Sequence, residues 1–96
     1  MDIHEIIKRT LSIPDLLHQM EYFKEYLNLV PNVKSPTTNR TFKTIGVEEY
    51  KGSWRIRLLK TDTGERCSCA IQLFEKKLKQ GSWIPVYRMP KRTLEL

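Results

Sequence analysis

The sequence lacks the long apolar segments of membrane proteins and secreted precursors. Among its 96 residues, no apolar run approaches the ~20 residues that a membrane-spanning helix requires. The opening stretch MDIHEIIKRTLS places acidic residues ahead of basic ones and has no continuous apolar segment, unlike a secretory signal peptide. We therefore expect a single intracellular domain over residues 1–96, cytoplasmic and without a membrane partner.

Cysteine is scarce, and its placement argues against disulfides and metal sites. The only two cysteines are Cys67 and Cys69. On a strand, side chains two positions apart lie on the same face about 6–7 Å from each other, too far for an unstrained disulfide. The two histidines, His4 and His18, do not have the spacing of metal ligands. We expect reduced thiols, no metal and no cofactor.

Catalytic motifs are also missing. The chain has no glycine-rich phosphate loop, no Cys-x-x-Cys or His-x-x-His pair and no nucleophile elbow. Its adjacent acids Glu48 and Glu49 fall in a predicted strand, where neighbouring side chains point to opposite faces and cannot share a proton. We expect no enzymatic activity.

Positive charge is present in excess and unevenly distributed. The formal net charge is +6. Residues 1–40 contain five basic and five acidic residues, whereas residues 41–96 contain twelve basic and six acidic residues. The whole excess therefore lies in the second part of the chain, which favours an anionic partner such as nucleic acid.

Two amphipathic helices are predicted within residues 1–30. Asp2 and Glu5 have the spacing of a capping box, which predicts a first helix ending near Thr10 or Leu11. Ser12 is expected to cap a second helix with Pro14 in its first turn. The apolar residues of this second helix follow the helical period: Ile13, Leu16, Leu17, Met20, Phe23 and Leu27.

Residues 31–40, PNVKSPTTNR, break the helical pattern. Two prolines and a cluster of serine, threonine and asparagine are typical of a loop. We expect a linker here, followed by an antiparallel sheet over residues 41–90 and a loose tail over residues 91–96.

The tripeptide Gly-Ser-Trp occurs at residues 52–54 and again at residues 81–83. A two-residue hairpin turn at Lys51-Gly52 would pair Tyr50 with Ser53. The resulting ladder includes the pairs Glu49 with Trp54, Glu48 with Arg55, Val47 with Ile56, Gly46 with Arg57 and Ile45 with Leu58. It collects apolar side chains on one face and arginines on the other, so a shift of one residue would mix the two sets.

A second turn is consistent with the same apolar face. A four-residue loop over residues 61–64 would place Cys67 opposite Leu58 and Cys69 opposite Ile56. If the strand continued to Leu73, Ile71 would lie opposite Trp54.

The second Gly-Ser-Trp precedes a fourth strand, from Trp83 to about Met89, and leaves two alternatives open. A tight turn at Gln80-Gly81 would bring Phe74, Trp83 and Tyr87 onto the arginine face. A helical turn through residues 75–80 would change the phase. Because Pro85 has no backbone N–H, the strand is expected at an edge or a bulge.

The predicted fold class is α+β: two N-terminal amphipathic helices packed on one face of a three- to four-stranded antiparallel β-meander. The opposite face is expected to be open and rich in arginine and, with the tight turn, in aromatic rings. Such a face suits single-stranded nucleic acid or RNA, because guanidinium groups bind phosphates and flat rings stack on bases. The candidate binding residues are Arg55, Arg57, Arg66, Phe74, Lys76, Lys77, Lys79, Trp83, Tyr87, Arg88, Lys91 and Arg92.

Two other interpretations remain at this point. The basic residues are equally consistent with an ordinary solvated strand face, and the aromatic residues with a second small core. A different function is that of a protein–protein interaction module: an adaptor, a subunit, or a phage- or mobile-element-encoded regulator of a host complex. It would bury the free sheet face, or pair an edge strand with a partner or a second copy.

Overall fold

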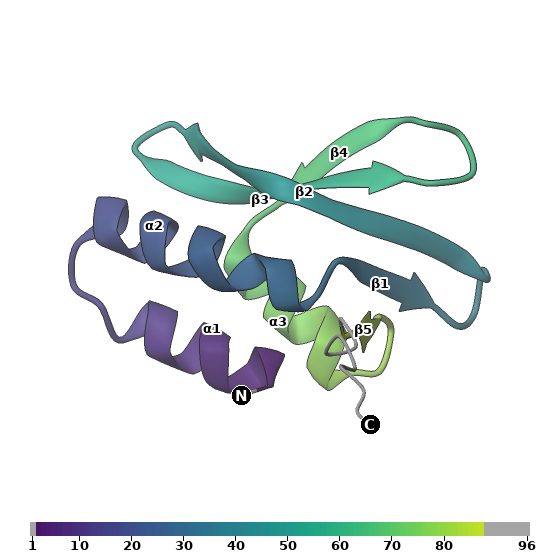
Figure 1. Ribbon diagram of the computed structural model, residues 1–96, viewed down its shortest axis with the longest axis horizontal. Coiled ribbons are helices and arrows are strands. Elements are labelled where there is room, and N and C mark those ends of the chain that lie inside the picture. The colour runs from purple at the N-terminus through teal and green to yellow at the C-terminus, as the bar shows by residue number, and fades with distance from the viewer. Residues whose placement is uncertain (1, 88–96) are drawn as a thin grey trace, which may run out of the picture.

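The computed structural model describes residues 2–87 and confirms the α+β class (Figure 1). The elements are α1 (Ile3–Leu11), α2 (Leu16–Tyr26), the short 3-10 helix η1 (Leu27–Leu29), β1 (Asn32–Ser35), β2 (Arg40–Tyr50), β3 (Ser53–Lys60), β4 (Arg66–Cys69), α3 (Ile71–Lys79) and β5 (Ile84–Val86). The antiparallel sheet has the order β4-β3-β2-β1-β5, so it has five strands rather than three or four. No helix in this part of the chain has the length and apolar character needed to cross a membrane.

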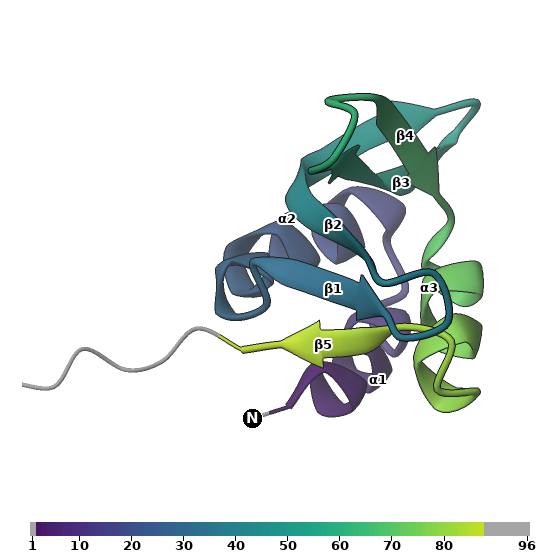
Figure 2. The same ribbon diagram turned by 90° about the vertical axis from the view of Figure 1, so that its right-hand side faces the viewer.

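The helices of residues 2–87 lie on one side of the twisted sheet (Figures 1 and 2). The first helix ends at Leu11, as predicted, and the Asp2 carboxylate caps it by accepting a hydrogen bond from the Glu5 N–H at 2.9 Å. Ile3, Ile6 and Ile7 are fully buried against the sheet and the other helices.

The predicted start of the second helix is wrong. Ser12 belongs to the end of α1, where its hydroxyl donates to the Arg9 carbonyl at 2.7 Å. Asp15 is the residue that caps α2, accepting from the His18 N–H at 2.9 Å. The physical reason is Pro14, which disfavours helical backbone in the residue before it and so keeps Ile13 out of the helix.

The predicted turn between β2 and β3 is confirmed. Lys51 and Gly52 have φ values of 47° and 77°, the positive φ that a type I′ turn requires at both positions. The register runs from Tyr50 opposite Ser53 to Gly46 opposite Arg57, as predicted.

The expected pair of Ile45 with Leu58 is wrong, because β2 has a bulge at this point. Thr44 lies opposite Leu58 and Gly46 opposite Arg57, so Ile45 is the extra residue. Gly46 has a φ of 148°, which L side chains rarely adopt. The bulge shifts the phase of β2, so that Phe42 faces the core and Lys43 faces outward.

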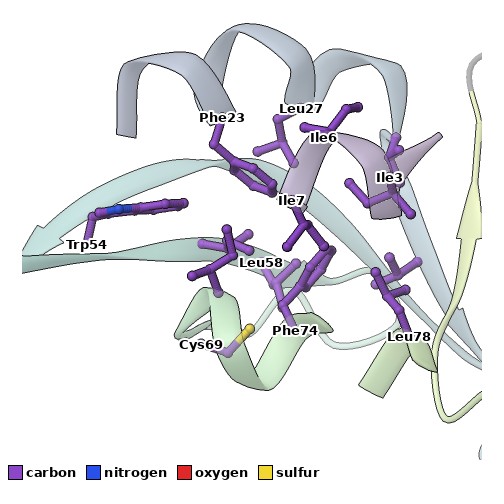
Figure 3. Close-up of a cluster of buried hydrophobic side chains, with 14 residues drawn as sticks. Ile3, Ile6, Ile7, Phe23, Leu27, Trp54, Leu58, Cys69, Phe74 and Leu78 are labelled. Carbon is purple, nitrogen blue, oxygen red and sulfur yellow. The ribbon is translucent and has the colours of Figure 1, made fainter. Parts of the chain in front are cut away.

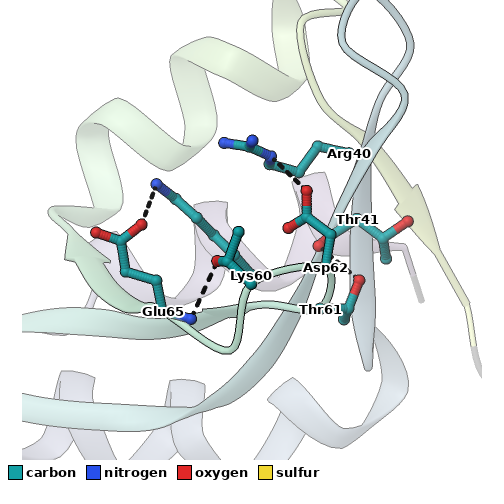
Figure 4. Close-up of polar contacts among 7 residues, drawn as sticks. Arg40, Thr41, Lys60, Thr61, Asp62 and Glu65 are labelled. Carbon is teal, nitrogen blue, oxygen red and sulfur yellow. Dashed lines mark hydrogen bonds and ion pairs between the residues drawn. The ribbon is translucent and has the colours of Figure 1, made fainter.

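The four-residue loop between β3 and β4 is also confirmed. Cys67 lies opposite Leu58 and Cys69 opposite Ile56. Two interactions between Lys60 and Glu65 close the loop (Figure 4). The backbone N–H of Lys60 donates to the Glu65 carbonyl at 2.8 Å, and their side chains form an ion pair at 2.9 Å. A 3.2 Å ion pair between Arg40 and Asp62 ties this loop to β2.

The expected linker over residues 31–40 is instead a strand and a tight turn. β1 pairs with β2 on one side and β5 on the other, and Val33 lies opposite both Phe42 and Pro85. Asn39, with a φ of 54°, closes the turn into β2. The local sequence does not predict this strand because its hydrogen-bond partners come from distant parts of the chain.

Residues 75–79 belong to the helix α3, with Gln80 as its C-cap, which decides between the two alternatives left open by the sequence. The chain leaves the sheet at Cys69 and α3 begins at Ile71, so the expected pair of Ile71 with Trp54 does not form. Phe74 is therefore fully buried rather than on the arginine face. β5 begins at Ile84 and is an edge strand, as predicted from Pro85.

The core lies between the helices and the inner face of the sheet (Figure 3). The rings of Phe23 and Trp54 are 5.3 Å apart between centroids, and those of Phe23 and Phe74 are 6.4 Å apart. The Trp54 indole N–H donates to the Gln19 side-chain oxygen at 3.3 Å, and the Gln19 amide donates to the Ile13 carbonyl at 2.6 Å. This chain of hydrogen bonds joins β3 to the loop between the first two helices.

Neighbouring residues of β3 should respond in opposite ways to the same substitution. Ile56→Asp places a carboxylate in the core and should cost on the order of 4 kcal/mol, enough to unfold a small domain. Arg57→Asp, one position along and on the outer face, should leave the fold intact. Urea denaturation of both variants tests the register, and a folded Ile56→Asp variant would show that it is wrong.

The two cysteines should differ in reactivity. Burial raises the pKa of the Cys69 thiol to about 11, and Cys67 beside it adds to the shift, so little thiolate forms in the native protein near pH 8.5. Iodoacetamide at that pH should modify Cys67, which is only partly buried, faster than Cys69, as followed by peptide mass spectrometry. Equal rates in the native protein would contradict this; equal rates in denaturant are the expected control.

The same shift predicts how stability depends on pH. The unfolded chain releases the Cys69 proton near pH 9, and the native chain holds it up to about pH 11. This thiol therefore lowers the free energy of unfolding as the pH rises through that window and has no such effect below it. Cys69→Val should show a smaller decline from pH 9 to pH 11 in urea denaturation, and an unchanged decline would contradict the assignment.

Candidate nucleic-acid interface

The outer face of the sheet carries a cluster of basic side chains. No helix of residues 2–87 covers this face (Figures 1 and 2). Because side chains alternate between faces and cross-strand partners share a face, the register assigns the outward residues of β1 to β4. Its charged members are Lys34, Lys43, Glu48, Arg55, Arg57 and Arg66. Five basic side chains thus share this face with one acid.

Arg55 contacts both neighbouring strands, β2 and β4. Its Nη2 donates to the Ser68 carbonyl of β4 at 3.3 Å, and its guanidinium carbon lies 4.8 Å from the centre of the Tyr50 ring. Its Nε is buried without a hydrogen-bond partner in the described structure. Stacking on Tyr50 and the bond to β4 therefore hold this cation in one orientation.

Arg57 forms an ion pair with Glu48. Glu48 lies opposite Arg55 in the ladder, as predicted, but its carboxylate contacts the Nε of Arg57 at 3.3 Å. Both side chains are partly exposed, and such surface pairs contribute about 0–1 kcal/mol. Arg57 can therefore exchange this partner for a stronger anion at little cost.

A shallow depression lies between Arg57 and Arg66. It has a volume of about 280 Å³ and is lined by Glu48, Arg57, Arg66, Cys67 and Ser68. Arg66 is exposed, and no ion pair joins it to another side chain of residues 2–87. The depression therefore presents two guanidinium groups and the Ser68 hydroxyl to an incoming anion.

The predicted binding residues omit three residues of this face: Tyr50, Lys43 and Lys34, the last of which fell in the expected linker. Tyr50 is 43% exposed and is in contact with Arg55. The predicted hairpin already placed it on the same face as Arg55, so the register contained the information. Lys43 could not be found in this way, because its outward position depends on the bulge at Ile45.

The other predicted binding residues do not join the arginine face. Lys76, Lys77 and Lys79 lie on α3, on the helical side of the sheet, where Lys79 pairs with Glu75 at 3.4 Å. Lys77 sits over the Trp83 ring, 5.4 Å from its centre.

The three predicted aromatic residues form part of the helix-side packing rather than an open platform. The Trp83 ring lies 5.3 Å from Phe42 and 5.8 Å from the buried Phe74. The Tyr87 hydroxyl accepts a 3.1 Å hydrogen bond from the Ile3 N–H at the start of α1. Phe74 and Trp83 therefore belong to the main core, neither to an open platform nor to a second small core. The predicted residues Arg88, Lys91 and Arg92 lie outside the described residues.

The composition of the face does not suit a metal centre. No group of three or more potential metal ligands occurs among residues 2–87.

Comparison with known proteins leaves the geometry as the only guide to function: no protein-family model, no curated protein and no solved structure gives a significant match to this chain.

Proposed function

We propose that this protein is a non-enzymatic binding domain that holds single-stranded nucleic acid or RNA on the outer face of its sheet. The observation that carries the proposal is the charge of that face, with five basic side chains and one acid. An anionic polymer can neutralise several of these cations at once, and the release of its counterions favours binding.

The arginines and Tyr50 suit two different parts of a nucleotide. Guanidinium groups bind phosphate oxygens through paired hydrogen bonds, and Arg57 and Arg66 flank the depression where a phosphate fits. The partly exposed Tyr50 ring, already in contact with Arg55, offers a surface on which an unpaired base stacks. Unpaired bases are accessible in single strands and loops, which favours these over duplex DNA.

The helical side of the molecule is a weaker candidate. The three helices together contain six basic and four acidic residues, whereas the outer face has five basic residues and one acid. A helix that reads the major groove of DNA needs a strongly basic surface, and α3, the most basic of the three, has three lysines of which Lys79 already pairs with Glu75 at 3.4 Å.

Removing two arginines of the depression should reduce the salt dependence of binding. With a fluorescein-labelled 12-nucleotide oligouridine, the double variant Arg57→Ala with Arg66→Ala should lower the slope of log K against log salt by about 1.4, roughly 0.7 for each lost phosphate contact. Fluorescence anisotropy at several salt concentrations measures it.

The matched control changes charge by the same amount elsewhere. Lys76→Ala with Lys79→Ala removes two cations from α3 and should leave the slope nearly unchanged. If the two double variants have equal effects, binding is a non-specific attraction to the net charge and not a property of this face. No detectable binding by the wild-type protein at low salt would refute the proposed function.

Tyr50 should contribute affinity that does not depend on salt. Loss of one stacked base costs about 1–3 kcal/mol, so Tyr50→Ala should weaken oligouridine binding at least fivefold with an unchanged salt slope. Tyr50→Phe keeps the ring and should bind like the wild type. An unaffected Tyr50→Ala variant in the same anisotropy titration would exclude stacking at this residue.

A further inference from the structure

One edge of β2 is left unpaired over half of its length. β1 pairs with β2 only from Arg40 to Lys43. Beyond the bulge, residues 46–50 of β2 pair with β3 alone, and no strand within residues 2–87 lies on their other side. An unpaired strand edge presents backbone donors and acceptors to any extended chain that reaches it.

The hairpin geometry identifies the backbone groups that point outward. In a two-residue hairpin, the residues flanking the turn exchange both backbone hydrogen bonds, and such pairs alternate along the ladder. Tyr50 and Glu48 therefore direct their backbone groups toward β3. Val47 and Glu49 direct theirs toward the open edge, where they match the hydrogen-bond pattern of an added antiparallel strand.

The helix α2 lies close to β2 (Figure 1). Two pockets are each lined by residues of both α2 and β2. The pocket near the hairpin has a volume of about 80 Å³ and is lined by Leu16, Leu17 and Met20 together with Glu49 and Trp54, among others. Leu16 and Leu17 are 46% and 55% exposed. The apolar residues predicted for the second helix therefore divide into two groups. Phe23 and Leu27 are buried in the core, whereas Leu16 and Leu17 line this pocket.

The second pocket, at the other end of the edge, is basic. It has a volume of about 330 Å³, and its lining includes Lys24 from α2, Asn28 from η1, and Lys43 and Gly46 from β2. Leu17, Met20 and Lys24 are spaced to lie along one side of α2. We call the two pockets and the open β2 edge between them the groove. Its end near the hairpin is apolar and bears the acidic Glu49, and its other end is basic at Lys24 and Lys43.

We propose that this groove binds an extended peptide from another protein, added to β2 as an antiparallel strand. An antiparallel peptide begins near the hairpin and ends near the bulge. Its apolar side chain enters the pocket of Leu16, Leu17 and Met20, and its acidic carboxyl-terminal end lies between Lys24 and Lys43. This orientation also brings the amino-terminal end of the peptide toward Glu49, so the charges at both ends of the groove agree with it.

The other edge strands of this chain suit the groove poorly as occupants from a second copy. β4 reads RCSC and β5 reads IPV, so neither contains an acidic residue for Lys24 and Lys43. Pro85 also removes a backbone donor from β5. The charge of the groove therefore favours an acidic peptide over β4 or β5 of a second copy.

The test uses a library of random hexapeptides displayed with free carboxyl termini and selected on the full-length protein. Enriched sequences should carry an acidic residue at or next to the carboxyl terminus and an apolar residue toward the amino terminus. Glu49→Pro removes the backbone N–H that Glu49 directs toward the open edge of β2. Calorimetry should then show about tenfold weaker affinity for an enriched peptide. Glu49→Ala, the matched control, retains that donor and should lose much less affinity.

Two further measurements keep the test independent of how well the proline variant folds. N-methylation of alternate amides of the enriched peptide removes its own strand donors and should abolish binding to the unaltered protein. Lys24→Glu should change the selected carboxyl-terminal residue from acidic to basic.

Several results would overturn the proposal. The first is that no peptide is enriched, and the second is that enriched peptides still bind after N-methylation and to Glu49→Pro. The third is that the wild-type protein sediments as a dimer and Glu49→Pro as a monomer. The last would assign the edge to a second copy. Oligouridine binding by Glu49→Pro, measured in parallel, separates this groove from the proposed nucleic-acid face.

Discussion

The burial of alternate β3 residues depends on a two-residue turn at Lys51 and Gly52. This turn aligns β3 with β2 so that Trp54, Ile56 and Leu58 face the helices and Arg55 and Arg57 face outward. A register shifted by one residue would move the arginines toward the core, where an unpaired guanidinium group is very costly to bury. The four-residue loop after Lys60 carries the same register into β4, so one local conformation determines the composition of both faces of the sheet.

The two proposed binding surfaces share the end of β2 but use different chemical groups. The outer face uses side chains, since Tyr50 and the arginines point away from the helices. The open edge uses backbone groups of Val47 and Glu49, which lie in the plane of the sheet. Because these directions are perpendicular, a nucleic acid on the face and a peptide on the edge would compete mainly for one side chain, Lys43, which belongs to both surfaces. Such an arrangement suits a protein that connects a nucleic acid to a protein partner.

The distribution of ion pairs concentrates the net charge on the outer face. Close pairs on the helices and at the β3–β4 loop, such as Glu5 with Arg9 and Lys60 with Glu65, balance much of the charge in those regions. Among the outward residues of β1 to β4 only Glu48 provides an acid, and it contacts Arg57. A net charge of +6 spread evenly would give weak attraction everywhere, whereas this arrangement gives one surface a strong local field.

The sequence by itself determined the α1 helix, both turns around β3 and the separation of arginines from apolar residues, because each depends on neighbours a few positions apart. It also contained the position of Tyr50, which follows from the same register. Only the tertiary structure decided the strand over Asn32–Ser35, the bulge at Ile45 that turns Lys43 outward, and the helix that buries Phe74. Those features depend on partners distant in the sequence: β1 is held between β2 and β5, and Phe74 packs against Phe23 and Trp83. Local patterns cannot reveal them, because the energy that selects them comes from contacts that exist only once the chain has folded.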